Sequence, residues 1–214
     1  MGQVILVRHG QTRVDASGVE GLAPLGWEQS RLAGEALRAR GVRPTLVASG
    51  TARCHLESLE AVGDAAGWDD VPGALDSGWD EFDHDVLVQR FPALAGERES
   101  SPAELQHWFE AAAREWTNGA AGVGETFRGF MVRVGTALAE VLEMTGPRDT
   151  TVVVTSAGAI AAIASTLLLP DADGELWQRL NSVIVHGSTS TLSIGPRGAA
   201  LVSFNEHAHL QSGR

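Results

Sequence analysis

The stretch that decides the fold is Val4-Ile5-Leu6-Val7-Arg8-His9-Gly10-Gln11-Thr12, near the start of a 214-residue chain. Its first four residues form a continuous apolar run, which is typical of a strand buried on both faces of a sheet covered by helices. Such a strand brings the residues that follow it to the carboxyl edge of the sheet, where open α/β sheets bind ligands. Arg8 offers a fork of donors for a phosphate or carboxylate, and a neutral His9 imidazole can act as a nucleophile. The stretch therefore predicts an anion site beside a nucleophile.

Strand and helix patterns alternate along the rest of the chain, which is the order typical of an α/β protein. We expect further strands over residues 45–48, 71–75, 151–155, 188–194 and 199–204, and helices ending near 40 and 66 and spanning 125–145, 157–169 and 175–180. These elements predict a three-layer α/β/α sandwich with a mostly parallel central sheet. Residues 77–124 follow a strand end and are predicted to form a helical lid insertion within a single domain that spans residues 1–214.

The charge balance limits the classes of partner. Sixteen Lys and Arg residues against 27 Asp and Glu residues leave a formal net charge of −11. A chain this acidic is a poor binder of nucleic acid or of an anionic membrane surface, so an anion site requires a local cluster of arginines.

The number of cysteines and the distribution of apolar residues indicate the cellular compartment of the protein. Cys54 is the single cysteine, which excludes an internal disulfide and suits a reducing compartment. Residues 150–170 carry no charge and are long enough to cross a bilayer, but polar residues divide them into a strand, a turn and a helix. We therefore expect a cytoplasmic protein with no membrane partner.

Polar groups follow three of the predicted strands. Arg8 and His9 follow the first strand, Ser49 leads to Arg53 after the second, and Ser156 follows the strand over residues 151–155. The carboxyl ends of parallel strands meet at one edge of a sheet, so we expect these groups to converge there.

The motifs at these strand ends resemble those of the histidine phosphatase superfamily, which has the phosphoglycerate-mutase-like fold. The resemblance lies in Leu6-Val7-Arg8-His9-Gly10-Gln11-Thr12, Leu22-x-x-Leu25-Gly26-x-x-Gln29, Ala48-Ser49-x-x-x-Arg53 and Asn205-x-x-x-His209-Leu210. These motifs occur in order over nearly the whole chain, so together they are far more specific than the Arg-His-Gly tripeptide.

The resemblance implies a phosphomonoesterase in which His9 attacks phosphorus and becomes a phosphohistidine that water then hydrolyses. Arg8 and Arg53 would hold the phosphoryl oxygens, with Gln11 beside them, so that catalysis is mainly positioning and electrostatics. The expected partner is either a small phosphorylated substrate or inorganic phosphate. The sequence contains no metal-ligand cluster of credible spacing, so we expect no metal and no cofactor.

A carboxylic acid should protonate the leaving oxygen. Glu81 is the expected donor, because Trp79-Asp80-Glu81-Phe82-Asp83 follows the third strand, where the family places its acid. Asp80 and Asp83 remain competitors for this role.

The chain departs from the family pattern at one position of the site. The family normally carries a second histidine after the fourth strand, in a Ser-His-Gly turn, where this chain has Ser156-Ala157-Gly158. The hydroxyl of Ser156 and the backbone N–H groups of a helix that begins near Ala157 are the favoured replacements. Four histidines are alternative replacements: His55, His84, His186 and His207. Of these, His55 is expected to point away from the site, because it lies two residues after Arg53 on a helix.

The missing histidine leaves a second class of function open. The chain could be a regulatory protein that binds a phosphorylated ligand with weak or no turnover. A phosphomutase is less well supported, because such an enzyme must shield the phosphohistidine from water and the tail after His209 is short.

Overall fold

The computed structural model describes residues 1–14, 20–83, 111–119, 124–170 and 174–211. Most of the predicted lid insertion over residues 77–124 lies outside the described residues, as does His84. The described part of that segment begins with the short 3-10 helix η1 (Ser77–Trp79) and includes a helical stretch over residues 111–117.

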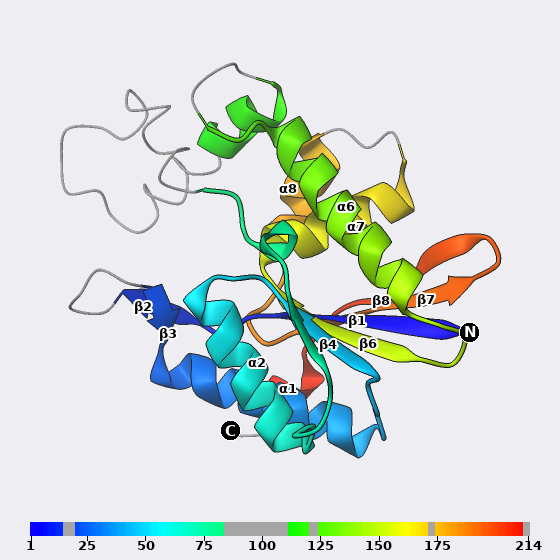
Figure 1. Ribbon diagram of the computed structural model, residues 1–214. Coiled ribbons are helices and arrows are strands. Elements are labelled where there is room, and N and C mark those ends of the chain that lie inside the picture. Colours follow the sequence, from blue (N-terminus) through cyan, green and yellow to red (C-terminus); the bar gives the residue numbers. More distant parts are fainter. Residues whose placement is uncertain (15–19, 84–110, 120–123, 171–173, 212–214) are drawn as a thin grey trace.

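A six-stranded sheet forms the centre of the molecule (Figure 1). Its strands lie in the order β5 (Gly73–Leu75), β4 (Leu46–Ser49), β6 (Thr150–Thr155), β1 (Gly2–Arg8), β7 (Thr189–Gly195) and β8 (Gly198–Glu206). The first four strands in this order are parallel, whereas β7 and β8 are antiparallel to their neighbours. A separate two-stranded ribbon pairs β2 (Thr12–Val14) with β3 (Glu20–Leu22).

Helices cover both faces of the sheet. One face carries α1 (Pro24–Ala39) and α2 (Arg53–Ala66), and the other carries α6 (Phe127–Met144), α7 (Ala157–Leu168) and α8 (Gly174–Asn181) (Figure 1). The side chains of β1 alternate between these layers, as the twofold period of a strand requires. Ile5 and Val7 pack in the core beneath α1 and α2, whereas Val4 and Leu6 pack in the core beneath α6 and α7. The three-layer α/β fold and its mostly parallel sheet are thus confirmed.

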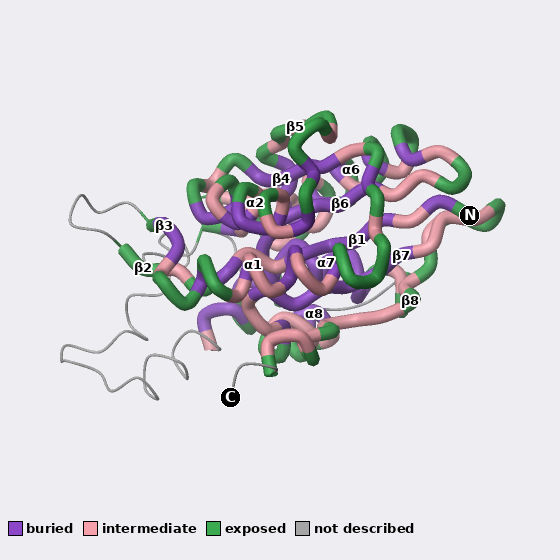
Figure 2. Tube along the Cα trace, turned by 90° about the horizontal axis from the view of Figure 1, so that it is seen from below, coloured by how far each residue is buried: buried purple, intermediate pink, exposed green. Residues whose placement is uncertain are grey.

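The two central strands and α7 form the most deeply buried part of the protein (Figure 2). Every residue of α7 from Ala157 to Ser165 is buried, which explains why this helix is apolar on all sides. Within the described ranges, no helix combines the length and the hydropathy needed to cross a bilayer.

Candidate active site

A cavity of about 450 Å³ opens beside the carboxyl ends of β1 and β6 and the first turn of α2. Its lining includes Arg8, His9, Cys54, His55, Glu81, Ser156 and His186. The structure therefore brings the residues after β1, the first turn of α2 and the turn after β6 to one site.

His9 lies at the end of β1 and presents an imidazole of defined tautomer. Its Nδ1 lies 2.8 Å from the carbonyl oxygen of Gly10, which can only accept a hydrogen bond, so Nδ1 carries the proton and Nε2 keeps its lone pair. Burial, reinforced by the nearby His55 and by Arg8, lowers the pKa of His9 well below its ordinary value. The ring is therefore neutral at neutral pH, which is the state that a nucleophile requires.

The loop that carries His9 is held by close backbone packing. The Gly10 N–H donates a hydrogen bond to Ser58 Oγ at 3.0 Å. A Cβ atom on Gly10 would lie 2.1 Å from the carbonyl oxygen of Gly26, and one on Gly26 would lie 2.1 Å from that of Gln11. Both motif glycines are thus needed because two backbone segments touch here.

Arg8 extends from the last residue of β1 into the same cavity. Its guanidinium donates a hydrogen bond to the carbonyl oxygen of Ile184, and its Nη2 lies 3.2 Å from Nε2 of His186. Burial and the charge of Arg8 lower the pKa of His186 to about 4, so this imidazole is a neutral hydrogen-bond acceptor for the arginine. His186 orients the Arg8 guanidinium.

The three candidate acids have different surroundings in the structure. The Glu81 carboxylate accepts a hydrogen bond at 2.9 Å from the backbone N–H of Gly158, in the first turn of α7, and it lines the cavity. The preceding segment is anchored by the Arg133 guanidinium, which donates to three carbonyl oxygens, those of Ser77, Gly78 and Asp80. Asp83 also lines the cavity but is exposed.

Asp80 is committed to a structural role. Its carboxylate accepts hydrogen bonds from the backbone N–H groups of Thr51 and Ala52, directly before α2. Partial burial tends to raise the pKa of this carboxyl, but the hydrogen bonds from His55, Thr51 and Ala52 outweigh that effect and lower the pKa to about 2. An acid that stays ionised in this way has no proton to donate at neutral pH.

The expectation that His55 points away from the site is wrong. Its side chain is buried, Nε2 lies 2.7 Å from Ser156 Oγ, and its ring centroid lies 5.4 Å from that of His9. Its Nδ1 lies 3.3 Å from the Asp80 carboxylate. Successive residues of a helix are rotated by about 100°, so Arg53 and His55 lie on nearly opposite sides of α2, and His55 is the one that faces the sheet edge.

The remaining predicted site residues do not line the cavity. The Arg53 guanidinium forms an ion pair with Glu57 at 2.7 Å, and its side chain is half exposed. Gln11 is exposed, and its backbone N–H donates to the side chain of Gln29. Ala157 is buried in the core beside the cavity residue Ser156.

The two histidines of the C-terminal motif also lie away from the cavity lining. Nδ1 of His207 lies 2.6 Å from the carbonyl oxygen of Asn205, and Nε2 of His209 lies 2.9 Å from that of Gly187. The His209 contact ties the last described helix, η2 (Ala208–Gln211), to the loop before β7, whereas the His207 contact is local.

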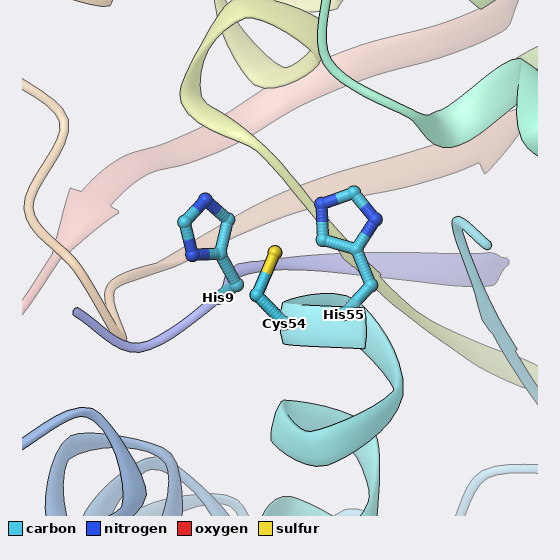
Figure 3. Close-up of side chains that lie close together, drawn as sticks. All are labelled: His9, Cys54 and His55. Atoms are coloured by element: carbon cyan, nitrogen blue, oxygen red, sulfur yellow. The ribbon is translucent and has the colours of Figure 1, made fainter. Parts of the chain in front are cut away.

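Cys54 is a cavity residue that the sequence reasoning missed. It lies between Arg53 and His55 in the first turn of α2, with its side chain beside the ring of His9 (Figure 3). Burial raises the pKa of its thiol to about 12, so the thiol is protonated at neutral pH. The 45-residue gap between His9 and Cys54 hides this proximity, because no local pattern joins the two positions.

Comparisons with known proteins agree with this architecture. A search of the curated proteins finds no match. Among solved structures, a protein from Bacillus stearothermophilus is similar with a TM-score of 0.73 and 18% identity, over 97% of this chain and 98% of the other. The alpha-ribazole phosphatase of Shigella flexneri is similar with a TM-score of 0.68 and 19% identity, over 96% and 97%. A mycobacterial glucosyl-3-phosphoglycerate phosphatase in complex with VO3 has a TM-score of 0.67 and 21% identity, over 96% and 100%.

The family assignment rests on the match of the sequence to a family model. The model of the histidine phosphatase superfamily (branch 1) matches residues 4–207, which is nearly the whole chain. The motifs that carry Arg8, His9 and the C-terminal His209 all fall within or beside that range. The chain belongs to the histidine phosphatase superfamily.

Proposed function

We propose that the protein is a phosphomonoesterase that acts through a phosphohistidine at His9. The observation that carries this proposal is the neutral His9 ring, with Nδ1–H bound to the Gly10 carbonyl oxygen, in a cavity shared with the Arg8 guanidinium and the Glu81 carboxylate. Membership of the superfamily and the phosphatases among the structural neighbours support the same reaction class.

The reaction proceeds in two displacements. In the first, which starts from the protonated, carboxylic-acid form of Glu81, the Nε2 lone pair of His9 forms a bond to phosphorus, the bond from phosphorus to the ester oxygen breaks, and Glu81 gives its proton to the leaving oxygen. In the second, Glu81 takes a proton from a water molecule whose oxygen attacks phosphorus, and the phosphorus–nitrogen bond breaks to release phosphate and neutral His9. Proton transfer of this kind contributes about 10²- to 10⁴-fold to the rate.

Arg8 holds the phosphoryl oxygens during both displacements. Its guanidinium already lies in the cavity, and such preorganised cations stabilise the charge that develops on a transferring phosphoryl group. Arg53 is the second phosphoryl ligand in this proposal. It lies beside the cavity residues Ala52 and Cys54, and a phosphoryl dianion competes with Glu57 for its guanidinium.

His55 and Ser156 together replace the family's second imidazole at Ala157. The hydrogen bond between His55 Nε2 and Ser156 Oγ places both groups at the cavity, and the Asp80 carboxylate lies 3.3 Å from Nδ1 on the far side of the His55 ring. Ser156 supplies its hydroxyl as the hydrogen-bond donor for a phosphoryl oxygen that the family pattern assigns to that imidazole, and His55 positions this hydroxyl at the cavity.

A chromogenic phosphate ester tests the proposal. We expect turnover by the wild-type protein and its loss in His9→Ala, with acid-labile phosphate trapped on the wild type alone. His207→Ala is the matched control, because His207 does not line the cavity. Equal turnover in His9→Ala and the wild type would reject the nucleophile.

A second function is favoured by one observation, the alanine at position 157. If Ala157 marks a lost catalytic group, the protein binds phosphate or a phosphorylated ligand without turnover. Calorimetric binding of phosphate in the absence of any turnover above background would favour that function over the phosphatase.

The described part of residues 77–124 follows β5 and places Glu81 and Phe82 at the cavity. We propose that this segment is a lid insertion within a single domain. The substrates of the protein in this proposal are small phosphorylated compounds.

A further inference from the structure

Three side chains of metal-binding type meet at the edge of the cavity. One ligand atom from each of His9, Cys54 and His55 lies within 4.8 Å of the others (Figure 3). We propose that these residues bind a thiophilic divalent cation, for which Zn²⁺ fits best, and that the bound cation inhibits the enzyme by occupying the His9 nucleophile. The inhibition rests on the proposed function, whereas the binding does not.

The spacing of the three ligand atoms suits a cation after a small contraction. A point equidistant from three atoms 4.8 Å apart lies about 2.8 Å from each of them. Zinc binds imidazole nitrogen at about 2.0–2.1 Å and thiolate sulfur at about 2.3 Å, so each ligand atom must move by less than about 1 Å. Rotation about side-chain torsions supplies movements of this size.

The groups behind the two imidazoles are those that metal-binding histidines require. A histidine ligand usually donates its second ring N–H to a carboxylate or a backbone carbonyl oxygen, which fixes the tautomer and the ring orientation. Nδ1 of His9 faces the carbonyl oxygen of Gly10, and Nδ1 of His55 faces the Asp80 carboxylate at 3.3 Å. The first contact is a hydrogen bond that leaves the lone pair on Nε2 of His9, whereas the second lies outside hydrogen-bond geometry, and Nε2 of His55 is held toward the cavity by Ser156 Oγ.

The identity of the third ligand selects the class of cation. A thiolate with two imidazoles favours zinc over magnesium or calcium, which prefer oxygen ligands. The Cys54 thiol loses its proton to solvent as the sulfur–metal bond forms, and the hydrogen bond between His55 and Ser156 is exchanged for a nitrogen–metal bond. The acidic cavity residues Glu20, Glu81 and Asp83 favour the approach of a cation.

Occupancy of this site removes the lone pair that attacks phosphorus. Once His9 Nε2 is bonded to the cation, it cannot form a bond to phosphorus, and His55 no longer positions the Ser156 hydroxyl. Zinc therefore competes with the phosphorylated substrate.

Cobalt spectroscopy on the full chain tests the binding without any assay of activity. Titration of the chelator-treated protein with Co²⁺ should produce a sulfur-to-cobalt charge-transfer band, and Zn²⁺ should abolish it by displacement. Because Cys54 is the single cysteine of the chain, the band reports this residue alone. We expect the band in the wild type and in His207→Ala and its absence in Cys54→Ser. Absence of the band in the wild type would overturn the site.

Activity measured in zinc buffers tests the inhibition separately. We expect turnover to fall in proportion to zinc occupancy and to return with chelator, and Cys54→Ser should need at least about tenfold more zinc for the same fractional loss. A charge-transfer band with unchanged or increased turnover would overturn inhibition while leaving the site. Absence of turnover in the metal-free protein would overturn both the proposed phosphatase function and the proposed inhibition. The cobalt spectrum would still test whether the metal site exists.

Discussion

Replacing Gly158 with alanine should lower the catalytic activity of this protein without lowering its stability. Gly158 lies in the first turn of α7, and its backbone N–H donates to the Glu81 carboxylate at 2.9 Å. A Cβ atom at this position would lie 2.1 Å from Glu81 Oε1, and its other two nearest atoms, at 2.9 and 3.2 Å, also belong to that carboxylate. The new methyl group therefore displaces the carboxylate, while the rest of the helix keeps its place.

The two effects of Gly158→Ala have opposite signs. An alanine in place of a helical glycine stabilises the fold by up to about 1 kcal/mol. The Glu81 carboxylate, however, must retreat by about 1 Å and loses its hydrogen bond from the helix. A misplacement of that size costs about 10²-fold in rate, and complete loss of the general acid costs up to about 10⁴-fold.

The choice of substrate makes this prediction specific to the proton donor. An alkyl phosphate has a poor leaving group and depends on protonation of its oxygen, whereas a nitrophenyl phosphate leaves readily as the phenolate. We expect Gly158→Ala and Glu81→Gln to lose turnover of the alkyl ester far more than of the nitrophenyl ester. The melting temperature of Gly158→Ala should equal or exceed that of the wild type.

Gly135→Ala is the matched control, because it also replaces a helical glycine but has open space around its Cβ position. It should leave turnover of both esters unchanged. Equal turnover of the alkyl ester in Gly158→Ala and the wild type would refute the role of Glu81, and a large fall in melting temperature would refute the packing argument.

Three further predictions concern the surroundings of the site. Arg53→Ala should raise KM for a phosphate ester more than it lowers kcat, and steady-state kinetics that show no change in KM would remove Arg53 from the phosphoryl site. The pKa of His186 is lowered to about 4 by burial and by a neighbouring guanidinium. Between pH 6.5 and 4 the unfolded chain therefore binds a proton that the folded protein excludes, so stability falls as the pH is lowered through this window, by about 1–2 kcal/mol for this partly exposed ring. Thermal melts in chelator should show a smaller fall from pH 7 to pH 5 in His186→Gln, and identical pH dependence would contradict the assignment. Gly10→Ala places a Cβ atom 2.1 Å from the carbonyl oxygen of Gly26 and should destabilise the protein by about 1–3 kcal/mol in denaturant unfolding. The control Gly63→Ala meets no atom within 4 Å and should be neutral or stabilising.

Local patterns were sufficient to predict the sheet and the position of the loop that carries Arg8 and His9. The apolar run over residues 4–7 is buried on both faces, and the turn that follows it delivers Arg8 and His9 to the cavity. The same holds for β6 and the turn at Ser156. These predictions succeed because burial on both faces of a strand imposes a continuous apolar run, and because a parallel strand can deliver its final residues only to the carboxyl edge.

Local sequence patterns did not predict the rotation of α2 about its own axis. The residue before this helix, Ala52, provides no side-chain cap, so the local sequence carries no strong signal for where the helix begins. The backbone there is held instead by the Asp80 carboxylate, which comes from a segment 28 residues further along the chain. The starting residue sets the helical phase, and the phase decides which side chains of the first turn face the cavity.

The sequence by itself therefore determined the fold, the position of the loop that carries Arg8 and His9, and the absence of an imidazole at position 157. Only the tertiary structure decided that His55 and Cys54 face His9, that Asp80 is committed to the start of α2, and that Glu81 lies against Gly158. The physical reason is that the features set by the sequence depend on patterns within single elements. The contacts decided by the tertiary structure depend on the rotation of one helix and on hydrogen bonds between segments far apart in the chain.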